Sequence, residues 1–187
     1  MGRGPELDTD RLLLRRWRQA DRAPFAALNA DPEVMAHFPA PLSRAQSDQM
    51  IDRMEAAFER QGYGLWAIEL RATGELLGFT GLNEVSFDAH FTPAVEVAWR
   101  LARPAWGFGY ASEAARAALA YGFDAVGLEE IVSFTTVGNA RSQAVMRRLG
   151  MTHEPADDFD HPGLPAGHPL RAHVLYRITA ARFARLW

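Results

Sequence analysis

The stretch from Trp106 to Ala114 (WGFGYASEA) places two glycines between a predicted strand and a predicted helix, and no other feature constrains the fold as strongly. Gly107 and Gly109 let the backbone turn sharply and leave its N–H groups uncovered. A helix that begins near Ala111 adds unpaired N–H donors and the positive end of its dipole. Such a junction is typical of a phosphate or pyrophosphate site, although the glycines alone are equally consistent with a tight turn that binds nothing.

The apolar pattern around this junction predicts one mixed domain, α/β or α+β, built around one sheet. Strands are predicted over residues 12–17, 65–70, 76–82, 94–101, 131–137, 151–154 and 174–178. Helices are predicted over residues 21–29, 31–38, 43–61, 111–123 and 140–149. A proline-rich stretch, residues 155–169, is predicted to be irregular. At 187 residues, the chain is expected to form a single domain, 1–187.

The composition excludes several classes of function. The net charge of −3 provides no basic field for nucleic acid, and cysteine is absent, which excludes a cysteine nucleophile. All 20 basic residues are arginine, so a Walker A lysine is absent too. No apolar run reaches the roughly 18 residues of a membrane span. No targeting segment is recognisable at the N-terminus, and we therefore expect a cytoplasmic protein without a membrane partner.

A dinucleotide-binding Rossmann fingerprint fits the glycines poorly. That motif opens the first βαβ unit and has an acidic residue about 20 positions further on, at the end of the second strand. Here the glycines lie past the middle of the chain, behind strands that look antiparallel. Glu129 and Glu130 stand near that distance but precede a strand. Coenzyme A remains as the third phosphate-containing candidate.

Several motifs of this chain together resemble the GCN5-related N-acetyltransferase (GNAT) superfamily, over about residues 7–179. The strand VEVAWRL (95–101) is followed by RPAWGFGYASEA (103–114). Asn139 and Ser142 match the family pattern N-x-x-S, and LGM (149–151) closes the next helix. The nearest branch contains the ribosomal-protein N-terminal acetyltransferases. One departure is Pro104, where the wider superfamily often carries Gln or Arg.

The resemblance implies a GNAT fold, in which one mixed, mostly antiparallel, twisted sheet is flanked by helices and split between its fourth and fifth strands. Acetyl-CoA would lie in the split, with its pyrophosphate on the amides of Gly107 to Ser112 and its pantetheine arm along the preceding strand. Asn139 would bind that arm, or would only cap the helix that follows. The implied cofactor-binding residues are Trp99, Arg100, Leu101, Trp106, Gly107, Phe108, Gly109, Tyr110, Ala111, Ser112, Asn139 and Ser142.

The implied reaction is N-acetylation of a primary amine, and it needs a base for the amine proton. Because the chain has no cysteine that could carry the acetyl group, we expect the amine to attack acetyl-CoA directly in a ternary complex. Glu96 is the first candidate base, with an outward-facing charge on an alternating strand as its alternative, and Glu84 is the second candidate. Met146 occupies the position where many relatives carry the acid, a tyrosine. Ser142 is therefore the candidate acid, ahead of Tyr110 and Tyr176, and a helix-start hydroxyl that only bonds the backbone is its alternative.

The resemblance implies that the acceptor is a protein N-terminus or a small-molecule amine. A non-catalytic acyl-CoA-binding module is the alternative function, because the usual tyrosine is missing. Homodimers are common among the relatives, so a homodimer is one expected state. His161, His168 and His173 match no standard zinc spacing, and we expect no metal. Their segment is predicted to be a substrate-side loop or a solvated connection.

Overall fold

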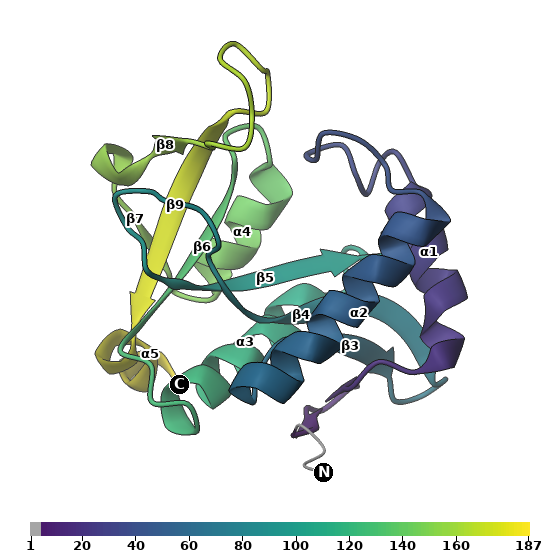
Figure 1. The fold of residues 1–187 in the computed structure, drawn as a ribbon. Coiled ribbons are helices and arrows are strands. Elements are labelled where there is room, and N and C mark those ends of the chain that lie inside the picture. Colours follow the sequence, from purple (N-terminus) through teal and green to yellow (C-terminus); the bar gives the residue numbers. More distant parts are fainter. Residues whose placement is uncertain (1–4) are drawn as a thin grey trace.

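The computed structural model describes residues 5–187 and contains one nine-stranded sheet (Figure 1). The strands are β1 (Leu7–Asp8), β2 (Leu12–Arg15), β3 (Leu65–Leu70), β4 (Glu75–Glu84), β5 (Val95–Leu101), β6 (Glu130–Thr136), β7 (Thr152–His153), β8 (Phe159–Asp160) and β9 (Ala172–Thr179). The helices are α1 (Arg22–Ala30), α2 (Arg44–Gln61), α3 (Tyr110–Asp124), α4 (Ala140–Arg148) and α5 (Ala180–Leu186). The main strand order is β1-β2-β3-β4-β5-β6-β9-β7, and β8 pairs with β9.

The sheet is split at β5 and β6. These two strands are parallel and pair only at Glu96 and Val132, whereas the neighbouring pairs β4–β5 and β6–β9 are antiparallel and continuous. Beyond Glu96 the two strands diverge, as Figure 1 shows. The prediction of a mostly antiparallel sheet split between its fourth and fifth strands is confirmed, because these are the fourth and fifth of the predicted strands.

Helices cover both faces of the sheet, because alternate residues of a strand point to opposite sides. On β3, Trp66 and Ile68 belong to the buried cluster under α3, while Ala67 belongs to the cluster under α1 and α2. Figure 1 shows α1 and α2 in front of β3–β5 and α3 behind them. The same alternation on β5 directs Val97 toward α3 and Ala98 toward α1 and α2.

Local signals place the ends of the helices. At α2, the Ser43 hydroxyl accepts the N–H of Gln46, and the Gln46 side chain accepts the N–H of Ser43, which completes a capping box. Gly62 ends this helix with φ +79°, a conformation that glycine adopts without strain. Helix α3 begins after Gly109, as its sequence predicts.

One predicted helix is absent, helix α5 was not predicted, and two residues of the stretch predicted to be irregular, 155–169, form strand β8 (Phe159–Asp160). Residues 31–38 form turns and bends instead of a helix, because Pro39 follows directly and a residue before proline avoids the helical region. Helix α5 was not predicted, and its Phe183 packs against Phe123 with ring centroids 5.2 Å apart. The packed chain therefore extends beyond residue 179.

In the range 5–187, no helix has the length and apolar character to cross a membrane. Residues 1–4 of the expected single domain, 1–187, lie outside the described part.

Candidate active site

The β5–α3 junction has the backbone geometry of an anion site. Gly107 and Gly109 have φ values of +86° and +81°, and nothing lies within 4 Å of where a Cβ of Gly107 would stand. The N–H groups from Gly107 to Ser112 donate to no backbone acceptor in residues 5–187. Six neighbouring donors at a helix N-terminus are a concentrated source of positive potential.

Ser112 provides a second indication that the junction suits an anion. Its hydroxyl oxygen is buried and has no hydrogen-bond partner among the described residues. An unpaired buried hydroxyl is unfavourable, so an oxygen-rich ligand that reaches it would relieve that cost. Phosphate oxygens fit both this hydroxyl and the unpaired N–H groups, and the predicted set from Gly107 to Ser112 is therefore chemically suited to a pyrophosphate.

The N-terminal segment holds the junction in place through Glu113. This carboxylate accepts the Thr9 hydroxyl at 2.6 Å and the Arg11 Nε at 2.7 Å. Burial works to raise the pKa of Glu113, but the hydrogen bonds from Thr9 and Arg11 hold it below its ordinary value. Arg11 Nη1 also donates to the Phe108 carbonyl at 3.0 Å. Glu113 is thus a structural carboxylate.

The predicted pantetheine strand has one unpaired edge. Trp99, Arg100 and Leu101 pair with β4 on one side, but β6 has diverged from them on the other. The side chain of Trp106 donates from Nε1 to the Leu101 carbonyl at 2.9 Å, which ties the end of this strand to the glycine junction. Phe108 and Tyr110 stack at the surface with ring centroids 5.6 Å apart. An extended ligand that enters the split would find free backbone groups along β5.

Glu96 lies where the two strands separate. It shares a face of β5 with Ala98, which packs toward α1 and α2. Burial raises the pKa of Glu96 to about 7, against the opposing effect of a 3.1 Å hydrogen bond from Asn83 Nδ2. A carboxyl with this pKa is partly ionised at neutral pH and can accept a proton there.

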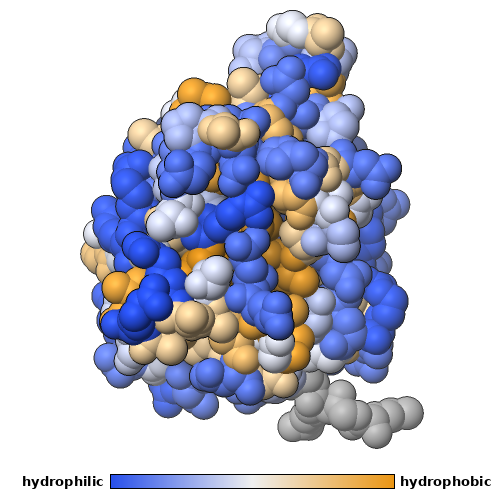
Figure 2. All heavy atoms as spheres, turned by 90° about the vertical axis from the view of Figure 1, so that its left-hand side faces the viewer, coloured by the Kyte–Doolittle hydropathy of each residue, from blue (hydrophilic) through white to orange (hydrophobic). Residues whose placement is uncertain are grey.

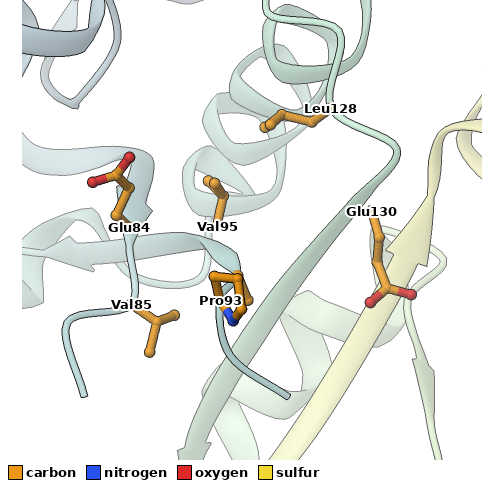
Figure 3. A pocket seen from close by; sticks show the side chains of 7 residues that line it. Glu84, Val85, Pro93, Val95, Leu128 and Glu130 are labelled. Carbon is orange, nitrogen blue, oxygen red and sulfur yellow. The ribbon is translucent and has the colours of Figure 1, made fainter. Parts of the chain in front are cut away.

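Glu84, the second candidate base, lies on the other face of the sheet from Glu96. It is exposed at the end of β4 and pairs with Val95, so its side chain is directed to the opposite face from that of Glu96. It borders a cavity of about 470 Å³ at the end of the sheet opposite the split (Figure 3). The cavity is lined by Glu84, Val85, Pro93, Ala94, Val95, Leu128 and Glu130. The structure therefore favours Glu96 over Glu84.

Asn139 and Ser142 lie at the start of α4. The Asn139 side chain caps this helix by accepting the N–H of Ser142 at 3.2 Å, and it donates to the Thr135 hydroxyl at 2.9 Å. Both ends of this amide are thus engaged by the protein. The Ser142 hydroxyl makes no hydrogen bond to the described residues and is half-buried, so it is free to act on a ligand. Tyr176 donates to Gln143 and accepts from Arg147, which leaves it less available.

The connection between α1 and α2 bridges the split, which the sequence did not reveal. His37 Nδ1 lies 3.0 Å from the Thr136 hydroxyl of β6, and the adjacent Phe38 ring lies 4.1 Å from the Arg100 guanidinium of β5. Burial and the nearby Arg141 lower the pKa of His37. His37 and Phe38 thus contact both diverging strands and cover the split on the face where α1 and α2 lie.

An aromatic cluster covers the β6–β9 part of the same face. It consists of Phe87, Phe91, Phe134, Phe159, His161 and His173. His161 and His173 have ring centroids 5.2 Å apart, and burial lowers the pKa of both. The nearby carboxylate of Asp160 forms an ion pair with Arg171. Within residues 5–187, no three histidine or carboxylate side chains are arranged to hold a metal.

The outer surface on the side of β9 and α5 is mainly hydrophilic with small apolar patches (Figure 2). The loop between β8 and β9 rises at the same end of the molecule as the α1–α2 connection (Figure 1). This arrangement is consistent with the prediction of a substrate-side loop, since both segments flank the split.

Known acetyltransferases resemble this chain in sequence and in fold. The family described as acetyltransferase (GNAT) domain matches residues 11–152. The FsC-acetyl coenzyme A-N(2)-transacetylase of Aspergillus fumigatus is 32% identical over an alignment of 196 positions, gaps included, that covers 97% of this chain and 79% of the relative. A solved acetyltransferase from Agrobacterium tumefaciens is 29% identical, with a TM-score of 0.75 and coverage of 93% of this chain and 94% of the other.

The fold also resembles that of a ribosomal L7/L12 alpha-N-protein acetyltransferase (RimL) solved in complex with coenzyme A. The TM-score is 0.74 at 17% identity, and the match covers 94% of this chain and 98% of the other. At this identity, the likeness concerns the fold alone. The match shows that the two chains share the arrangement of the sheet and helices.

Proposed function

The chain belongs to the acetyltransferase (GNAT) family of acetyl-CoA-dependent enzymes, and from that premise we propose that it transfers acetyl to a primary amine by direct attack in a ternary complex. The observation that carries the proposal is Glu96, a carboxyl with a pKa of about 7 at the point where β5 and β6 separate. Acetyl-CoA supplies the activated thioester, and the remaining tasks fall to residues of this chain.

Binding of acetyl-CoA is assigned to the glycine junction and the free edge of β5. The unpaired N–H groups from Gly107 to Ser112 and the Ser112 hydroxyl would hold the pyrophosphate. The backbone of Trp99, Arg100 and Leu101 would pair with the pantetheine arm, as an added strand does. Trp106, Phe108, Tyr110, Ala111 and Asn139 complete the proposed contacts.

Glu96 would accept the proton of the attacking amine, directly or through one water. An α-amine has a pKa near 7.7 and is partly neutral at pH 7, whereas a lysine-type amine near 10.4 is almost fully protonated. A base with a pKa of about 7 is well matched to the α-amine. As the C–N bond forms and the C–S bond breaks, the sulfur leaves as a thiolate, and Ser142 or water would protonate it.

The acceptor is proposed to be a peptide or protein N-terminal amine, with a small-molecule amine as the second candidate. The half-buried aromatic cluster beside Glu96 supports an acceptor with some apolar surface. The Aspergillus relative, by its name, acetylates the compound FsC, and this supports the second candidate. A cytoplasmic location and a homodimer remain predictions.

Calorimetry with acetyl-CoA, CoA and NAD tests the first step. Binding of both CoA compounds without a response to NAD is expected. CoA release is then followed by thiol detection with a panel of amines, and mass spectrometry identifies the acetylated product. Binding without CoA release from any amine would instead support the non-catalytic acyl-CoA-binding module. Absence of binding would contradict both functions.

A further inference from the structure

Arg100 is a largely enclosed cation without an acidic partner among the described residues. Its Nη1 donates to the Asn29 Oδ1 at 2.7 Å, and its guanidinium lies 4.1 Å from the ring of Phe38 and 5.4 Å from that of Phe79. Its Nε is buried without a hydrogen-bond partner. Its Nη2 has none either but is not fully buried. Only neutral groups therefore hold this charge.

Other enclosed arginines of this chain are neutralised. Arg15 is 2% exposed and pairs with Asp21 at 2.7 Å and with Glu69 at 2.6 Å. Arg177 pairs in the same way with Asp157 and Glu130. Because burying an unpaired charge is costly, the lack of a carboxylate at Arg100 is an exception that needs a reason. Burial lowers the pKa of Arg100 to about 10, so the side chain still carries its charge at neutral pH.

The position of Arg100 relates it to the acceptor side of the split. Glu96, Ala98 and Arg100 point to one face of β5, the face covered by α1 and α2. The glycine junction continues into α3, which lies on the opposite face. Four residues of strand separate Arg100 from Glu96 by about 13 Å. A ligand that approaches Glu96 along the α1–α2 face would therefore reach the Arg100 guanidinium, which lies against the ring of Phe38.

We propose that Arg100 binds a carboxylate of the amine acceptor through its free Nη2, at a distance from the amine set by the Glu96–Arg100 spacing. This inference rests on the proposed function and deepens it by defining the acceptor class: a zwitterion that carries a primary amine at one end and a carboxylate about 10–13 Å away. An extended peptide spans about 3.3–3.6 Å per residue, so three or four residues fit this distance.

Glycine peptides of two to five residues test the inference, each as the free acid and as the C-terminal amide. The rates are measured at pH 9, where the amines of both series are mostly neutral. We expect kcat/KM for the free acid to exceed that for the amide by about 10-fold or more at three or four residues, mainly through KM, because a charge-assisted hydrogen bond has that strength. Equal values for acid and amide at every length would overturn the inference.

Two substitutions separate binding from a structural role. In Arg100→Met, kcat/KM for the free acids should fall at least about 10-fold further than kcat/KM for the amides, so that the preference for the free acid disappears. Arg103→Met removes the same charge from an exposed arginine that already pairs with Glu33, and it should keep the preference. An equal loss for acids and amides in Arg100→Met, or a large loss of acetyl-CoA binding, would show that Arg100 only supports the fold or the cofactor.

The two proposals fail differently. If no amine releases CoA, the proposed function fails, and calorimetry of tetraglycine against its amide still tests Arg100 in the wild-type protein. If other amines release CoA but no free-acid peptide does so, the proposed function stands and the carboxylate site is wrong. If Arg100→Met does not fold, the comparison of acids with amides in the wild type decides alone.

Discussion

The Asn83 side-chain amide donates a 3.1 Å hydrogen bond to the carboxyl of Glu96, from the opposite position on the neighbouring strand. This bond favours the ionised carboxylate, while burial favours the neutral acid, and burial has the larger effect on the pKa. The two residues together set the pH at which Glu96 becomes a base. Asn83 acts through Glu96 and is a positioning residue.

Replacing Asn83 by alanine should move the acidic limb of the pH–rate profile. The wild-type kcat/KM is expected to rise with pH through about 7, as Glu96 loses its proton. Without the Asn83 bond, the pKa of Glu96 rises further, and the limb should shift to higher pH by about half a unit or more. Initial rates between pH 5.5 and 9.5 measure the shift. An unchanged limb with a uniformly lower rate would mean that Asn83 has only a structural effect.

The raised pKa of Glu96 also predicts how stability depends on pH. A carboxyl whose pKa is higher in the folded state binds its proton more tightly there, so this contribution to stability is full below the unfolded value of about 4.5. It is lost as the pH rises through 7. The Glu96→Gln variant lacks this titration, so its stability relative to wild type should increase between pH 5 and pH 8. Urea unfolding at both pH values tests this, and a constant difference would contradict the shifted pKa.

Alanine at Gly107 should weaken acetyl-CoA binding more than it weakens the fold. Gly107 has φ +86°, where an L-residue costs about 1–2 kcal/mol, and the added methyl group would occupy the open space beside the N–H groups. We expect at least a 10-fold increase in Kd by calorimetry. Gly74→Ala is the matched control, because Gly74 has φ +74° and open space in the distant β3–β4 turn. Equal Kd values for the two variants would exclude the glycine junction as the binding site.

Removing one partner of the buried ion pair of Arg15 and Asp21 should destabilise the fold, because it leaves the other charge buried. Asp21 is 4% exposed and accepts both terminal nitrogens of Arg15, at 2.7 and 2.9 Å. Asp21→Asn leaves a buried guanidinium with Glu69 alone, and we expect a loss of about 2–4 kcal/mol. Asp52→Asn removes an exposed partner of Arg22 and should cost less than about 1 kcal/mol. If urea unfolding gives similar losses of unfolding free energy for Asp21→Asn and Asp52→Asn, burial does not explain why the loss at Asp21 is the larger one.

The sequence allowed the order of most strands and helices to be predicted, because their apolar periods and end signals are local. Glu96 was a candidate because the resemblance to the GNAT superfamily places a base at this position, on the strand beside the cofactor. Its partner Asn83 was not predictable, since the β4–β5 register depends on how residues 85–94 connect the two strands. The turns over residues 31–38 also depend on distant contacts, those of His37 with Thr136 and of Phe38 with Arg100.

Acetyl transfer by wild type and Glu96→Gln across the pH range tests the central claim most directly. Each protein is first saturated with acetyl-CoA, and CoA release is then followed with an amine that the wild type accepts. The account predicts an equal Kd for acetyl-CoA in both proteins and a rate at least about 100-fold lower in the variant. It also predicts loss of the Glu96 titration near pH 7, which leaves the titration of the amine itself. A variant that turns over at the wild-type rate with the same pH dependence would contradict the assignment of Glu96 as the base.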